Sequence, residues 1–330
     1  MKIGITYDLR SEYLAMGYSE EETAEFDRES TIAAIEKTLH SLGYRTDRIG
    51  HLKQLMERLQ KGHRWDVVFN ICEGMHGIAR EAQVPALLDA YRIPYVFSSP
   101  LVMALTLDKA MTKRVVRDAG VSTPEFYVVE KSADIEKIAL PYPLFAKPLG
   151  EGTGKGIDEM SVIGNAEELK QRCLYLLSEY RQPVLVETFL SGREFTTGIV
   201  GTGEKARAIG TIEIRLMEQA EKNVYSYVNK EECESLVEYV PIGGKIKEEC
   251  EVLALKAYKV LGCEDAGRVD IRYDASGKPG FIEINPLPGM HPEHSDLPIL
   301  AHQNGIPYKD LMKMIMDSAL EKVNYHAKAK

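Results

Sequence analysis

Two short segments near the C-terminus, residues 267–274 and 280–286, constrain the fold more than any other part of the chain. The first reads Gly-Arg-Val-Asp-Ile-Arg-Tyr-Asp and the second reads Gly-Phe-Ile-Glu-Ile-Asn-Pro, with Ala-Ser-Gly-Lys-Pro between them. Glycine and proline in the connection are typical of a hairpin loop. The pattern therefore predicts two strands joined by a turn.

Side-chain alternation along these two strands brings polar groups together. Arg268 and Asp270 share one face of the first predicted strand, while Glu283 and Asn285 share one face of the second. Oxygen ligands without cysteine or histidine among them suit Mg²⁺, which also takes waters and substrate phosphates as ligands. The residues therefore indicate a Mg²⁺ site formed by Asp270, Glu283 and Asn285 beside the Arg268 cation. The spacing leaves open a second interpretation, a solvated sheet face with mixed charges.

The two segments resemble the metal-binding end of the ATP-grasp superfamily, in its D-alanine–D-alanine ligase branch. In that branch a strand ending Arg-x-Asp and a strand ending Glu-x-Asn-x-x-Pro-Gly hold two Mg²⁺ ions on ATP, and Pro288 and Gly289 complete the match here. The similarity covers nearly the whole chain. It implies an α/β chain with α+β lobes, an ATP-grasp fold that follows an N-terminal doubly wound parallel-sheet domain. It also implies ATP and two Mg²⁺ ions as cofactors, with Mn²⁺ as a substitute metal.

A chain of 330 residues is longer than a single hydrophobic core usually supports, which predicts two or three domains. The resemblance divides them as residues 1–100, a substrate-binding domain, residues 101–187, a lobe with a phosphate loop, and residues 188–330, a lobe with the metal site. In the first domain, apolar strands at 2–7, 44–49 and 67–71 alternate with helical stripes, which predicts a parallel layer.

The composition argues against several kinds of partner. A formal net charge of −9 is unsuited to nucleic acid, which demands a basic surface. No apolar run approaches the roughly 18 residues needed to span a membrane. The first residues enter a strand without the pattern of a signal peptide. Five scattered cysteines without a CxxC motif predict reduced thiols and a cytoplasmic protein.

The glycine-rich segment 149–156, Leu-Gly-Glu-Gly-Thr-Gly-Lys-Gly, can present backbone N–H groups to phosphate. It lacks the glycine spacing and the Ser or Thr of a Walker A loop, and a strand rather than a helix is predicted at 157–163, which excludes a dinucleotide fingerprint. A surface turn is the remaining alternative. In the resembled family, a strand, a glycine loop and a second strand fold over the triphosphate. That implies nucleotide contacts for Lys147, Gly152, Thr153 and Gly154.

The resemblance supplies the other nucleotide contacts. Three further segments match parts of the family that surround ATP. They are an Asp-Lys pair in the helix predicted at 101–119, the apolar strand at 184–190 and the loop at 225–230. From the residues alone, each of these side chains is as well explained as a solvated surface group. The implied contacts are to phosphate for Lys109 and Lys230, to adenine for Glu187 and Leu190, and to ribose for Glu194.

The substrate residues are less determined. Typical members of the family have a Glu–Ser–Tyr network against the first substrate. Here Glu231 and Thr153 stand in the tyrosine and serine positions, and the glutamate is either Glu25 or Glu29, because an acidic insertion at 8–28 interrupts the match.

Two further loops face the predicted substrate site. Residues 73–81 follow the third strand, where open α/β sheets bind ligands, and they make Glu73 and His76 candidates, with a polar turn as the alternative. Arg80-Glu81 stand where the family has Glu-Asp, which leaves the substrate open. The loop at 288–298 implies Gly289 and Ser295 at the acceptor site, while its histidines favour a hydrogen-bonded loop over a transition-metal site.

The resemblance implies an ATP-dependent carboxylate–amine ligase that joins two amino acids through an acyl phosphate, as in peptidoglycan synthesis. The implied catalytic residues are Arg268, Lys230 and Thr153. Two alternatives remain open, a ligase for other amino or hydroxy acids and a nucleotide-binding protein without catalysis. Amino acids are the expected partners, and a homodimer is expected because dimers are common among similar ligases.

Overall fold

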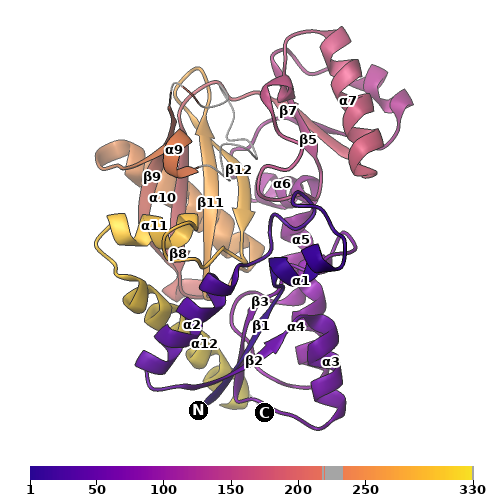
Figure 1. The fold of residues 1–330 in the computed structure, drawn as a ribbon. Coiled ribbons are helices and arrows are strands. Elements are labelled where there is room, and N and C mark those ends of the chain that lie inside the picture. The colour runs from indigo at the N-terminus through magenta and orange to yellow at the C-terminus, as the bar shows by residue number, and fades with distance from the viewer. Residues whose placement is uncertain (218, 220–232, 329–330) are drawn as a thin grey trace.

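The computed structural model describes residues 1–217, 219 and 233–328, and within them the strands form three sheets (Figure 1). The N-terminal sheet is parallel, with the order β2-β1-β3, and the other two, β4-β7-β5-β6 and β10-β9-β8-β11-β12, are antiparallel. The strands are β1 Lys2–Tyr7, β2 Arg45–Gly50, β3 Val67–Ile71, β4 Phe126–Val129, β5 Leu144–Pro148, β6 Val162–Ile163, β7 Val184–Thr188, β8 Glu194–Val200, β9 Arg207–Leu216, β10 Val237–Pro241, β11 Ala266–Tyr273 and β12 Pro279–Asn285.

Helices cover both faces of the parallel sheet and pack against both antiparallel sheets (Figure 1). The α-helices are α1 Arg10–Ala15, α2 Glu29–Ser41, α3 Leu52–Gln60, α4 Gln83–Ala90, α5 Pro100–Leu107, α6 Lys109–Asp118, α7 Ala166–Tyr180, α9 Cys233–Leu236, α10 Gly244–Leu261, α11 Asp296–Gln303 and α12 Tyr308–Lys328. Short 3₁₀ turns lie at η1 Arg80–Ala82, η2 Ser132–Lys137, η3 Glu159–Ser161 and η4 Gly203–Lys205.

The parallel sheet is buried on both faces, as its apolar strands predict. Ile3 and Ile5 of β1 pack with α2 in one apolar cluster, while Val68 of β3 and Leu55 of α3 belong to a second cluster on the other face. All five residues of β3 are buried. The predicted doubly wound layer is therefore confirmed.

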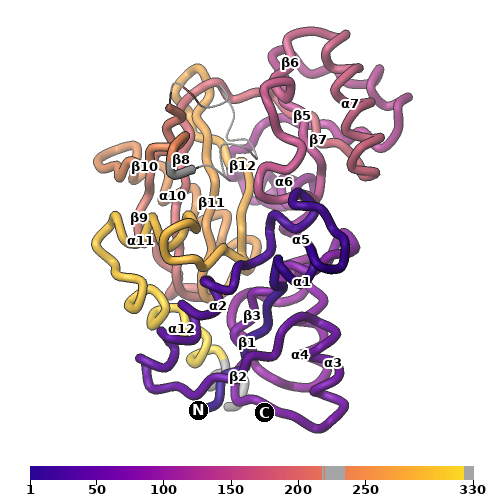
Figure 2. The backbone as a smooth tube through the Cα atoms, in the orientation of Figure 1, coloured from indigo at the N-terminus to yellow at the C-terminus, as the bar shows by residue number. Residues whose placement is uncertain are grey.

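The C-terminal helix returns to the N-terminal sheet. Leu311 and Ile315 of α12 are fully buried in the same cluster as Ile3 and Ile32. Figure 2 shows the backbone of α12 beside α2 at this face of the sheet. Both ends of the described chain thus contribute to one core. The division into three domains at residues 100 and 187 remains a prediction.

The helix predicted at 101–119 is in fact two helices, α5 and α6, which meet at Asp108. Asp108 has an extended backbone, and its carboxylate accepts a hydrogen bond of 2.9 Å from the amide of Met111, so it caps α6. Aspartate is a preferred N-cap because its side chain satisfies an amide that lacks an intrahelical partner. The break makes Lys109 the first residue of a new helix.

Other local predictions were partly wrong. The strand predicted at 157–163 contains only the two residues of β6, because Asp158 caps the 3₁₀ turn η3 through the amide of Met160. Helix α1 lies in the insertion at 8–28, which the sequence predicted to be irregular, and α11 begins within the loop predicted at 288–298. The loop predicted at 225–230 lies outside the described residues. Among the described helices, none combines the length and apolar character needed to cross a membrane.

Replacing Asp108 tests the break. The Asp108→Ala substitution removes the acceptor for the Met111 amide and should lower the free energy of unfolding by about 1 kcal/mol. Asp108→Asn keeps an oxygen acceptor and should cost less. Chemical denaturation followed by circular dichroism measures both variants, and an equal loss in the two would show that the cap is not the cause.

Candidate active site

The register of β11 and β12 places the predicted metal ligands side by side. Arg268 pairs with Asn285, and Asp270 pairs with Glu283, with a register shift between Asp270 and Ile271. Paired residues of antiparallel strands present their side chains on the same face. The side-chain grouping predicted from alternation is therefore present in the structure.

Arg268 lies between two carboxylates. One guanidinium nitrogen is 2.8 Å from Asp270 Oδ1 and 2.9 Å from Asp296 Oδ2. Thr196 on β8 donates a hydrogen bond of 2.7 Å to the same Asp270 oxygen, and Tyr239 donates one of 3.0 Å to Asp296. These contacts hold the arginine at the edge of the main cavity, which has a volume of about 570 Å³.

The chemistry of the donor set fits Mg²⁺. Asp270 and Glu283 supply two carboxylates and Asn285 supplies an amide, and the buried Asn285 amide nitrogen has no hydrogen-bond partner within the described chain. Within the same residues, no three His, Cys, Asp or Glu side chains are arranged to hold a metal ion. Two carboxylates and an amide suit Mg²⁺, because this ion commonly completes its shell with waters and substrate phosphates.

Two lysines from different elements converge on Glu283. The ammonium groups of Lys109 and Lys147 lie 3.9 Å and 3.4 Å from Glu283 Oε2. Burial lowers the pKa of Lys109, although Glu283 partly compensates. Burial also opposes the charge of Lys147, but Glu187 and Glu283 outweigh it and raise its pKa. The cations predicted to meet phosphate therefore lie beside the predicted metal ligands.

A small cavity of about 70 Å³ adjoins these residues and contains the predicted base and ribose contacts. Its lining includes Glu187, Leu190 and Glu194. Both oxygens of the buried Glu187 carboxylate already face ammonium groups, since Lys113 is at 2.8 Å and Lys147 at 3.6 Å. Because the two lysines occupy this carboxylate, Glu187 lines the small cavity as part of a buried ion-pair cluster, and its predicted contact with adenine remains a prediction.

The glycine loop approaches the main cavity closely. Gly152 and Thr153 line the cavity, whereas Gly154 does not. A Cβ atom on Gly152 would lie 2.2 Å from Glu25 Oε1, so a side chain there would displace the Glu25 carboxylate from its present position. Lys155 anchors the loop through Glu25 at 3.3 Å and Glu151 at 2.6 Å.

The structure separates the two candidate glutamates of the acidic insertion. Glu25 lines the main cavity and is 2.8 Å from Arg80, with both side chains about 8% exposed. Arg80 and Lys155 counteract the effect of burial and lower the pKa of Glu25 to about 2. Glu29 does not line the cavity, because its side chain is 61% exposed and pairs with Arg48 on the surface. Of the two glutamates, Glu25 is therefore the one that lines the cavity.

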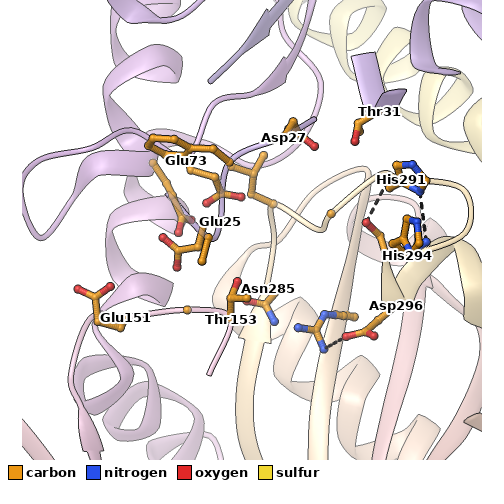
Figure 3. A pocket seen from close by; sticks show the side chains of 18 of the residues that line it. Glu25, Asp27, Thr31, Glu73, Glu151, Thr153, Asn285, His291, His294 and Asp296 are labelled. Carbon is orange, nitrogen blue, oxygen red and sulfur yellow. Dashed lines mark hydrogen bonds and ion pairs between the residues drawn. The ribbon is translucent and has the colours of Figure 1, made fainter. Parts of the chain in front are cut away.

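Glu73 and Glu25 lie together at one end of the cavity, and His291, His294 and Asp296 lie at the other (Figure 3). Gly289 and Ser295 also line this cavity, and their contact with the acceptor remains a prediction. His76 does not reach the main cavity. It lines a neighbouring cavity of about 880 Å³, where its ring nitrogen is 3.3 Å from the Tyr18 hydroxyl.

Two acidic groups at the first end are strongly perturbed. Burial raises the pKa of Glu81 to about 7, with Arg80 opposing and Glu25 adding to the shift. Burial, together with the charges of Glu81 and Glu25, raises the pKa of Glu73 well above its usual range. Lys230 and Glu231, which the sequence placed near the nucleotide and the substrate, lie outside the described residues.

The family model described as "D-ala D-ala ligase C-terminus" matches residues 115–317. The D-alanine–D-alanine ligase of Bordetella avium is 33% identical over 77% of this chain and 79% of its own length. The corresponding protein of Aquifex aeolicus is 32% identical over 86% of this chain and 92% of its own. This chain belongs to the D-alanine–D-alanine ligase family.

Solved structures show the same fold for this ligase. The D-alanine–D-alanine ligase of Bacillus anthracis, crystallised with ATP, has a TM-score of 0.73 at 24% identity, covering 99% of each chain. A D-Ala:D-Ser ligase from Enterococcus faecalis has a TM-score of 0.74 at 20% identity, covering 96% of this chain and 99% of its own. The predicted ATP-grasp fold is confirmed.

Sequence reasoning missed several residues of the site. Lys113 is fully buried against Glu187, and its spacing of one helical turn from Lys109 was an available signal. Asp296 lies in the segment that the sequence predicted as a loop, and no prediction was made for the segment that contains Tyr239. Their contacts with the Arg268 site join distant parts of the chain, so no local pattern could reveal them.

Matched substitutions test the glutamate assignment. In the ligase, Glu25→Gln should lower kcat/KM for the amino-acid substrate by about tenfold or more, because Arg80 and Lys155 lose a buried partner. Glu29→Gln should change kcat/KM by less than about twofold, because an exposed ion pair contributes little. ADP release at varied amino-acid concentration measures both, and similar effects of the two substitutions would contradict the assignment.

The raised pKa of Glu81 predicts how stability depends on pH. Between its ordinary value of 4.5 and about 7, the folded ligase holds this proton while the unfolded chain has lost it. The contribution of Glu81 to stability therefore falls as pH rises through this window. Glu81→Gln should be more stable than the parent by roughly 3 kcal/mol at pH 8 and nearly equal to it at pH 5.

Thermal unfolding at the two pH values measures this effect. Glu57→Gln, an exposed change on α3, serves as the control and should be neutral at both. A Glu81→Gln protein less stable than the parent at pH 8 would contradict the assignment.

Proposed function

We propose that this ligase activates the carboxylate of one amino acid with ATP and joins it to the amine of a second. The observation that carries the proposal is that Lys109, Arg268 and Glu283 line a cavity of about 570 Å³, while Lys147 and Asp270, which contact Glu283 and Arg268, line the small cavity beside it. The names of the relatives make D-alanine the first substrate to test. The three predicted domains would then supply substrate, phosphate and metal contacts, respectively.

The first step needs positioning and charge neutralisation more than a protein nucleophile. A donor carboxylate oxygen attacks the γ-phosphorus of ATP and ADP leaves, which forms an acyl phosphate. Lys109 and Lys147 are in position to neutralise the phosphates, with Lys230 as a further candidate. Asp270, Glu283 and Asn285 would hold one or two Mg²⁺ ions, which when bound neutralise phosphate charge.

The second step needs a group that stabilises negative charge on oxygen. The acceptor amine, having lost a proton, attacks the acyl carbon and phosphate leaves from the tetrahedral intermediate. Arg268 is buried at the cavity edge and anchored by Asp296, so it can donate to the developing oxyanion without rearrangement. Thr153 and the glycine loop would exclude water, which otherwise hydrolyses the acyl phosphate.

A second candidate function is the same reaction with an amino acid other than D-alanine. The observation that favours it is the buried pair of Arg80 and Glu25, together with Glu81, at the substrate end of the cavity. The homodimer and the cytoplasmic location expected from the sequence also remain proposals.

Release of ADP from Mg²⁺·ATP in the presence of amino acids tests the function. We expect release that depends on an amino-acid pair, with dipeptide identified by mass spectrometry. Arg268→Ala should lower kcat by about 10²–10³ and leave the KM for ATP within a few fold, because it removes an oxyanion donor. Arg207→Ala, an exposed arginine on β9, is the control and should be neutral. ATP binding without release for every pair of D- and L-amino acids tried would overturn the proposal.

A further inference from the structure

The substrate end of the main cavity holds two carboxyl groups that have no ion-pair partner among the described residues. Glu81 is 9% exposed and lines the cavity, and Glu73 lines it beside Glu25 (Figure 3). Neither Glu73 nor Glu81 has a hydrogen bond or an ion pair from its carboxylate to any residue that the structure describes. We call Glu25, Asp27, Glu73 and Glu81 the acidic end of the cavity.

Other buried carboxylates of this protein have cationic partners. Glu187 is 2.8 Å from the Lys113 ammonium, and Asp265 is 2.9 Å from that of Lys322. Taking a carboxylate out of water is costly unless a cation or several donors replace the lost hydration. Glu73 and Glu81 lack ion-pair partners and hold their protons more tightly than usual, and a positively charged ligand in the same cavity would let them ionise.

Glu25 does not add an unpaired negative charge to this end of the cavity, because two cations already neutralise its carboxylate. Its carboxylate meets Arg80 at 2.8 Å and Lys155 at 3.3 Å. Arg80 and Lys155 are thus paired with Glu25 and, for Lys155, also with Glu151 at 2.6 Å, whereas Lys109 acts on Glu81 through its charge without an ion pair. The α-ammonium of a simple amino acid would supply one positive charge for the two remaining carboxylates.

A metal ion fits this end poorly. The part of the chain that the structure describes contains no three His, Cys, Asp or Glu side chains placed to hold one. An ammonium group needs only hydrogen-bond acceptors at ordinary distances, which two carboxylates provide.

We propose that the donor substrate of this ligase is a diamino acid whose side-chain ammonium binds Glu73 and Glu81. The inference rests on the proposed ligase reaction and replaces D-alanine by a basic amino acid as donor. The α-carboxylate of the donor faces Arg268, Lys109 and the metal ligands, and its side chain extends into the acidic end. The side-chain ammonium of the donor takes no part in the reaction and keeps its proton.

Pairs of donors matched in chain length test the proposal on the unaltered enzyme. With Mg²⁺·ATP and D-alanine as acceptor, kcat/KM is measured for ornithine against norvaline and for lysine against norleucine, each in both configurations. Mass spectrometry identifies which amino acid is at the N-terminus of the product. We expect at least one diamino acid to exceed its neutral partner by about tenfold or more. Equal or better use of the neutral amino acid in every pair would overturn the inference.

Charge-removing substitutions show whether the acidic end causes the preference. Glu81→Gln and Glu73→Gln should each reduce kcat/KM for the diamino acid by about 10–100-fold more than for the neutral partner. Glu57→Gln on the surface of α3 should preserve the preference. An equal loss for both donors would assign Glu73 and Glu81 a structural role and overturn the inference.

The outcomes separate this inference from the proposed function. ADP release with neutral amino acids alone would contradict the proposal of a diamino acid donor, and the proposed ligase function would still hold. Absence of release with every pair, despite ATP binding, overturns both. The comparison of donors on the parent protein needs no substitution, so it decides the question even where a variant fails to fold.

Discussion

The antiparallel register of β11 and β12 is the constraint on which the site depends. It sets Arg268 opposite Asn285 and Asp270 opposite Glu283, so one sheet face presents two carboxylates, an amide and a cation. A slip of one residue would turn these side chains to the opposite face, where the apolar residues of the hairpin pack against α10. The buried contacts of that opposite face therefore fix the position of the polar one.

Glu283 is the point at which separate parts of the fold meet. It lies on the five-stranded sheet, Lys147 lies on the four-stranded sheet, and Lys109 begins α6 beneath both. The three groups compensate one another's buried charge, and each alone would be costly at this depth. A ligand with several negative oxygens can replace Glu283 as the partner of both lysines, which is the property expected of a phosphate site.

The opposite end of the cavity has the reverse charge balance. There Arg80 and Lys155 are committed to Glu25, and burial keeps the pKa of Glu81 near 7. Unpaired buried carboxyl groups lower the stability of the empty protein, and binding of a cationic ligand would raise it again. In the proposed reaction, the contrast between the lysines around Glu283 and the acidic end would orient an amino acid by its own charges.

The sequence by itself determined the elements whose signals are local. Alternation specified the β11–β12 hairpin and its grouped polar face, continuous apolar runs specified the buried strand β3, and glycine content specified the loop at Gly152. Even the break at Asp108 had a local signal in its capping residue. Only the tertiary structure decided that Glu25 and not Glu29 reaches the cavity, that His76 faces a different one, and that Asp296 holds Arg268. These outcomes depend on contacts between residues far apart in the chain. Hydrophobic periodicity carries no information about which distant charged residues are buried together in one cavity.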